Sequence, residues 1–73
     1  MSSPRAAARA RRILLDALAS LSDFPERGHR VEPESLDLRE LHVKFGKYGY
    51  AMRYRIMADE VFVTRIYHVR QAR

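Results

Sequence analysis

The last third of the chain alternates β-branched and aromatic residues with arginines, and this pattern constrains the fold more than any other feature. Two such runs, residues 49–56 and 60–71, flank a short polar break at residues 57–59, which predicts a β-hairpin. Four arginines lie along these runs: Arg53, Arg55, Arg65 and Arg70. Alternate side chains of a strand point to opposite faces of the sheet. A hairpin with both faces buried in a core would not carry these arginines. The pattern therefore predicts a sheet with a basic face.

The length of 73 residues limits the chain to one domain, residues 1–73, and a domain of this size is only marginally stable on its own. The absence of cysteine excludes disulfides and thiolate metal sites. Three imidazoles are available, from His29, His42 and His68, but their spacing matches no familiar metal motif. We therefore predict no metal or cofactor, and expect a partner to supply additional stability.

The charge is strongly basic, with 14 Lys plus Arg against 9 Asp plus Glu and a formal net charge of +5. All but two of the basic residues, Lys44 and Lys47, are arginine, which binds phosphate and carboxylate groups through two parallel hydrogen bonds. This composition fits either nucleic acid or an acidic protein partner. No apolar run reaches the length of a membrane span and no signal-peptide pattern is present, so we expect a soluble, cytoplasmic protein.

The N-terminal region predicts a helix over about residues 4–22. Ser3 and Pro4 form a helix start, with a hydroxyl cap followed by proline in the first turn. Apolar residues then recur at three- and four-residue spacing, which indicates one buried stripe. Pro25 disfavours helical geometry at the preceding residue and ends the helix. Another face carries arginines, which we interpret mainly as a solvated surface: Arg5, Arg9 and Arg12.

Residues 23–37 are interpreted as a connector, because proline, glycine and acidic residues punctuate them. Three strands of an antiparallel meander are expected over residues 38–70. Alternation in the first strand places Glu40, His42 and Lys44 on one face, and alternation in the third places Val61, Val63, Arg65, Tyr67 and Val69 together. The predicted fold class is α+β, with one N-terminal helix packed on a three-stranded antiparallel sheet.

Four short motifs occur in order along the chain. They are Phe-Pro-Glu-Arg-Gly at 24–28, Leu-Arg-Glu-Leu at 38–41, Gly49-Tyr50 with Tyr54-Arg55, and His68-x-Arg70-Gln71. Together they resemble the ParE branch of the RelE/ParE toxin superfamily, the plasmid stabilisation toxins of type II toxin–antitoxin modules. The resemblance implies a small α+β unit in which two N-terminal helices pack on a curved antiparallel sheet. The chain begins where the second of those helices begins, so a truncated form of that fold is expected.

The resemblance implies one of two activities. RelE-like members cut messenger RNA on the ribosome, whereas ParE-like members inhibit DNA gyrase without known catalysis. Cleavage through the ribose hydroxyl requires a base, an acid and cations near the developing charge. When the RelE-like catalytic set is carried over residue by residue, the resemblance puts His42, Lys44 and Arg70 at three of its positions. At a fourth position, directly after Gly-Tyr, this chain has Ala51 instead of arginine. Because this set is only partly present, the resemblance favours a binding toxin.

We therefore predict a ParE-like toxin that docks on a target such as DNA gyrase and is neutralised by a cognate antitoxin. We expect it to form either a homo-oligomer or a toxin–antitoxin hetero-oligomer. The residues predicted to bind partners are Arg39, Arg53, Arg55, Arg65 and Arg70. Two alternatives remain open: a ribosome-dependent endoribonuclease acting on mRNA, and a non-toxic remnant that serves as a basic protein-binding module. A plain nucleic-acid-binding domain is disfavoured, because the glycine-rich fingerprint with exposed aromatics is missing.

Overall fold

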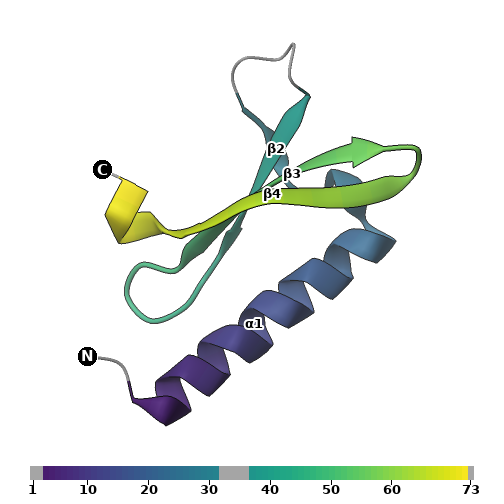
Figure 1. Ribbon diagram of the computed structural model, residues 1–73. Helices are drawn as coiled ribbons and strands as arrows, with labels where there is room; N and C mark the ends of the chain where they lie inside the picture. Colours follow the sequence, from purple (N-terminus) through teal and green to yellow (C-terminus); the bar gives the residue numbers. More distant parts are fainter. Residues whose placement is uncertain (1–2, 32–36, 73) are drawn as a thin grey trace.

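The computed structural model describes residues 3–31 and 37–72 of the chain. Within those ranges the chain forms helix α1 (Pro4–Asp23), the 3-10 turns η1 (Pro25–Arg27) and η3 (Val69–Ala72), and four strands. The strands are β1 (His29–Arg30), β2 (Leu38–Val43), β3 (Tyr50–Met57) and β4 (Glu60–His68). They pair antiparallel in the order β1-β2-β3-β4, and α1 runs along one face of this sheet (Figure 1). The predicted α+β class, with one helix packed on an antiparallel meander, is confirmed.

Helix α1 begins and ends close to where the sequence predicts. The Ser3 side-chain oxygen accepts a hydrogen bond from the backbone N–H of Ala6 at 3.1 Å, and Pro4 occupies the first helical position. At the other end, the N–H of Phe24 donates to the carbonyl of Ser20 at 2.9 Å, and the helix stops before Pro25. Among the described residues, no helix has the length and apolar character needed to cross a membrane.

The core lies between α1 and one face of the sheet. Ala17 and Leu21 of the helix pack against Leu41 of β2 and against Met52 and Tyr54 of β3. Tyr54 is fully buried but satisfies its hydroxyl, which donates to the carbonyl of Pro25 at 2.7 Å and accepts the N–H of Gly28 at 2.8 Å. These two bonds attach the segment after α1 to the middle of the sheet.

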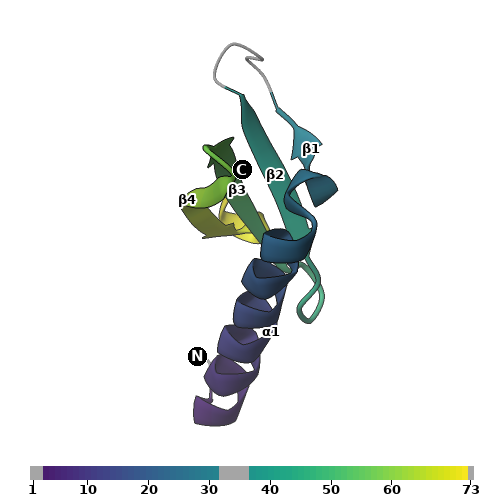
Figure 2. The same ribbon diagram turned by 90° about the vertical axis from the view of Figure 1, so that its right-hand side faces the viewer.

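A fourth strand lies inside the predicted connector, so the expected count of three strands is wrong. Strand β1 is only two residues long and forms the sheet edge next to β2 (Figure 2), with His29 opposite Glu40 and Arg30 opposite Arg39. Two residues cannot display a period, so no alternation identifies this strand in the sequence. Its position depends on long-range bonds, including one from Arg39 Nη1 to the carbonyl of Gly28 at 2.9 Å.

The predicted faces of the last strand are also wrong, because β4 contains a bulge. Arg53 of β3 pairs with Arg65, whereas the next β3 residue pairs with Val63, so Thr64 is an extra residue in β4. The Thr64 hydroxyl donates to the Arg53 carbonyl at 3.2 Å at this point. An inserted residue reverses the alternation. Arg65 and Tyr67 therefore lie on the face opposite α1, whereas Val63 faces the helix side.

Candidate functional site

A polar cluster centred on Glu40 lies on the sheet face opposite α1. Alternation along β2 places Glu40 and His42 on this face, since the intervening Leu41 packs in the core. Cross-strand pairing then brings His29 from β1 and Arg53 from β3 opposite Glu40. Tyr67 of β4 joins them because of the bulge, through its hydroxyl. Glu40 is only 7% exposed, so its carboxylate has to be satisfied by these neighbours.

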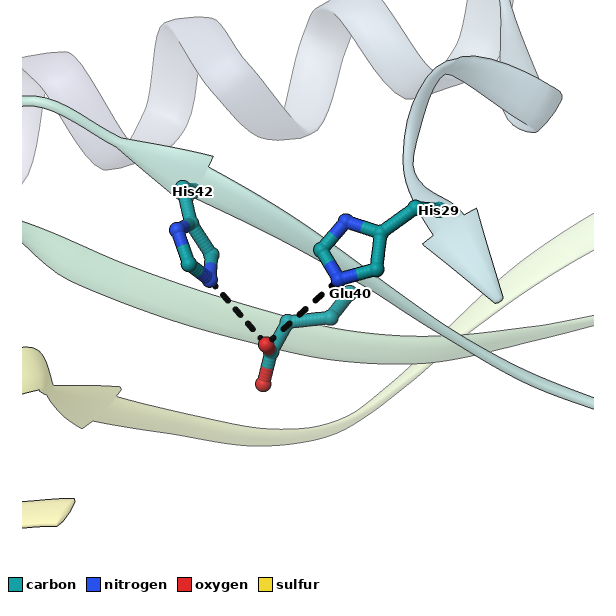
Figure 3. Close-up of side chains that lie close together, drawn as sticks. All are labelled: His29, Glu40 and His42. Atoms are coloured by element: carbon teal, nitrogen blue, oxygen red, sulfur yellow. Dashed lines mark hydrogen bonds and ion pairs between the residues drawn. The ribbon is translucent and has the colours of Figure 1, made fainter. Parts of the chain in front are cut away.

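The two carboxylate oxygens of Glu40 have separate partners. Oε2 accepts hydrogen bonds from Arg53 Nε at 3.0 Å and from the Tyr67 hydroxyl at 2.5 Å. Oε1 lies 3.0 Å from His42 Nε2 and 3.9 Å from His29 Nε2 (Figure 3). The two imidazole rings lie edge to face with centroids 5.6 Å apart. One buried carboxylate therefore organises side chains from all four strands.

These contacts determine the protonation of the cluster. Burial raises the pKa of Glu40, but hydrogen bonds from Tyr67, Arg53 and His42, together with the charge of Arg53, outweigh it and lower the pKa from 4.5 to about 2. The hydrogen bond to Glu40 raises the pKa of Tyr67 and of Arg53. At neutral pH the carboxylate is ionised while both of these partners keep their protons. A carboxylate with so low a pKa is a poor general base.

Two of the five predicted partner-binding arginines form bonds within the protein. Arg53 is the ion-pair partner of Glu40. Arg39 donates from Nη1 to the carbonyls of Gly28 at 2.9 Å and Glu26 at 3.3 Å, which holds the segment after α1 on the sheet. Replacing either arginine would therefore disturb the fold as well as any partner contact.

The other three predicted arginines are differently placed. Arg65 is exposed, and its guanidinium lies 4.7 Å from the centroid of the Tyr67 ring on the cluster face. Arg70 is exposed in η3 and lies 5.5 Å from the centroid of the Tyr48 ring. Arg55 is half-buried, and its Nε has no hydrogen-bond partner among the described residues. Arg65 and Arg70 are thus the best exposed members of the set.

The three residues expected from the ribonuclease pattern do not form a joint centre. His42 is bonded to Glu40, Lys44 is exposed just after β2 ends, and Arg70 contacts Tyr48. In the described part of the chain, no hydrogen bond or ion pair links these three residues to one another. His68 is packed in the sheet, since its ring meets that of Tyr50 edge to face at 5.2 Å.

Sequence reasoning missed three members of the cluster: His29, Glu40 and Tyr67. The spacing Glu40-x-His42 within a strand was an available signal, because residues two apart share a face. His29 carried no such signal, since its place depends on the two-residue strand β1. Tyr67 was assigned to the wrong face because the bulge at Thr64 has no clear mark in the sequence.

Comparisons with known proteins match the chain to a toxin family and to two individual toxins. The chain matches the family described as "ParE toxin of type II toxin-antitoxin system, parDE" over residues 1–73. It is 46% identical over 65 residues to Toxin RelE1 of Caulobacter vibrioides (strain ATCC 19089 / CIP 103742 / CB 15), which covers 89% of this chain and 67% of that protein. Toxin RelE3 of the same organism is 38% identical over 65 residues, with the same coverage. No solved structure matches the chain.

Proposed function

Because this chain belongs to the ParE toxins of type II toxin–antitoxin systems, within the RelE/ParE superfamily, we propose that it acts in the cytoplasm as a binding toxin. In this proposal it docks on DNA gyrase and a cognate antitoxin neutralises it. The observation that carries the proposal is the basic sheet face opposite α1. It is organised around the Glu40 carboxylate, whose two oxygens already have hydrogen-bond partners within the protein.

The cluster supports docking because it holds this face rigid. Glu40 joins side chains of all four strands, and Arg65 lies on the adjacent Tyr67 ring at 4.7 Å. An arginine stacked on an aromatic ring has already lost much of its rotamer freedom, so a partner that binds it loses less entropy. The face therefore suits an acidic protein surface.

The same geometry disfavours cleavage of RNA. The pKa of Glu40 is about 2, so this carboxylate takes up a proton poorly at neutral pH. Ala51, which replaces the arginine of the RelE-like pattern, pairs with His42 on one side and with Tyr67 on the other. A methyl group therefore stands between the two side chains where a cation would stabilise developing phosphorane charge.

The antitoxin in this proposal provides acidic and apolar groups together. Acidic side chains would pair with Arg65 and Arg70, which are exposed. Apolar side chains would cover Met57 and Phe62, two large hydrophobic residues on the sheet face opposite α1 that are each 43% exposed. Such a segment gains affinity from burial and specificity from charge.

A second function, ribosome-dependent mRNA cleavage, is favoured by one observation. Glu40 Oε1 and His42 Nε2 are 3.0 Å apart and Arg53 is adjacent, which provides a candidate base oriented by a carboxylate, and a cation, on one face. The names of the two relatives, both called RelE, agree with this candidate. It would require His42 rather than the carboxylate to accept the proton.

Two parallel assays distinguish these functions. Purified protein should inhibit gyrase supercoiling, and primer extension on ribosome-bound mRNA should reveal no new ends. Codon-specific cleavage that disappears in His42→Ala or Arg70→Ala, but persists in the helix variant Arg9→Ala, would overturn the proposal in favour of the ribonuclease. Inactivity in both assays would instead support a non-toxic, basic protein-binding module.

A further inference from the structure

Three potential metal ligands converge on the face opposite α1. His29 Nε2, Glu40 Oε1 and His42 Nε2 all lie within 4.8 Å of one another. The histidines come from two strands, β1 and β2, and both rings direct a nitrogen at the same carboxylate oxygen (Figure 3). We propose that these three residues bind a divalent transition-metal ion, with Zn²⁺ as the best match.

The distances from Glu40 Oε1 to the two histidine nitrogens are close to those of a zinc site. Zn–N and Zn–O bonds of about 2.0–2.2 Å place tetrahedral ligand atoms roughly 3.3–3.5 Å apart. The separations in the structure, 3.0 Å from Oε1 to His42 Nε2 and 3.9 Å from Oε1 to His29 Nε2, bracket this value. The longer one exceeds hydrogen-bonding distance, so His29 gains a bonded partner when a cation enters. Small rotations of the two imidazoles complete the geometry.

The remaining groups of the cluster prepare Glu40 as a ligand. Arg53 and Tyr67 both bind Oε2, which fixes the orientation of the carboxylate and leaves Oε1 directed at the histidines. Supporting hydrogen bonds of this kind hold the ligands of natural metal sites in place.

Two features limit the affinity. The positive charge of Arg53, on the other carboxylate oxygen, opposes a cation. Metal binding also replaces the hydrogen bond between His42 and Glu40. With three protein ligands, the site should bind Zn²⁺ more weakly than a closed four-ligand structural site.

Exposure of the histidines makes the site accessible. The side chains of His29 and His42 are 63% and 62% exposed, so an ion can enter directly from solvent. Imidazole with carboxylate suits Zn²⁺ and similar divalent ions rather than Ca²⁺ or Mg²⁺, which prefer all-oxygen sites. A bound ion would join the two-residue strand β1 to β2, and binding to the folded state alone stabilises it.

The test is titration of the 73-residue chain with Zn²⁺ by calorimetry, and with Co²⁺ by visible absorption, which reports the coordination geometry. We expect one ion per chain and a rise in Tm with Zn²⁺ that a chelator reverses. His29→Gln and His42→Gln should each weaken binding by at least about tenfold, since loss of an outer-shell partner alone costs 10–100-fold. Glutamine keeps a hydrogen-bond donor near Glu40, and circular dichroism verifies that each variant folds.

His68→Gln is the matched control, because His68 packs on Tyr50 outside the cluster. Zinc binding that survives in this variant and is lost in the other two supports the proposal. The proposal is overturned if the wild-type chain binds Zn²⁺ no more tightly than the His29→Gln, His42→Gln double variant.

Discussion

Replacing Glu40 with glutamine should destabilise the protein strongly at neutral pH and much less in acid. Glutamine has the shape of a protonated glutamate but lacks the negative charge that Arg53, Tyr67 and His42 bind. The variant therefore represents the wild-type protein with Glu40 neutral. Its stability relative to the wild type measures how much the ionised carboxylate contributes.

The magnitude follows from the pKa of Glu40. Folding lowers this pKa from 4.5 to about 2, and each pKa unit corresponds to about 1.4 kcal/mol, so the linked stability is at most about 3.5 kcal/mol. Water around the exposed histidines screens part of it, and we expect about 2–3 kcal/mol at pH 7. Because the folded pKa is the lower one, this contribution is complete above about pH 4.5 and disappears as the pH falls toward 2.

Urea denaturation of the wild type and of Glu40→Gln at pH 7, 4.5, 3 and 2 tests this argument. The difference in unfolding free energy should be largest at pH 7 and should shrink steadily below pH 4.5. Glu60→Gln is the control, since Glu60 is exposed at the start of β4 and should change stability by less than about 0.5 kcal/mol. A Glu40→Gln effect as small as that of the control, or one that is the same at every pH, would refute the reasoning.

Two further predictions concern the backbone that supports the sheet. Tyr54→Phe should cost about 1–3 kcal/mol in urea denaturation, because the buried N–H of Gly28 loses its acceptor; no loss would mean that this bond contributes nothing to stability. Gly49→Ala should lower stability by more than about 2 kcal/mol, since Gly49 has φ +96° and a Cβ there would collide with the Val43 carbonyl. Gly46→Ala, at φ +63° with open space around it, should cost clearly less, and equal Tm values for the two alanine variants would contradict this account.

Much of the fold follows from local sequence signals. The serine cap with Pro4 and the stop before Pro25 define the helix, and alternation defines the long strands with their short connections. These signals are local, because caps depend on a few neighbouring residues and alternation depends on one strand. The fold class and the faces of β2 and β3 could therefore be predicted from the sequence.

The candidate site was less predictable because it depends on pairing between distant residues. Arg53 and His42 were identified by type and position, but Glu40, the group that binds both, was not. His29 reaches the cluster because Tyr54 and Arg39 hold the segment after α1 against the sheet. The bulge in β4 then reversed the face of Tyr67. Neither effect is visible in hydrophobic periodicity, since each depends on tertiary contacts.

The most direct test of the central claim is which face of the toxin the antitoxin binds. Isothermal titration with a cognate antitoxin should compare Arg65→Ala, on the sheet face opposite α1, with Arg9→Ala, on the exposed side of α1; both side chains are exposed. We predict that Arg65→Ala costs more than about 1 kcal/mol, at least about fivefold in Kd. Arg9→Ala should cost only a few tenths of a kcal/mol, because exposed helix charges are screened. A costly Arg9→Ala together with a silent Arg65→Ala would place the partner on the helix layer and contradict the account.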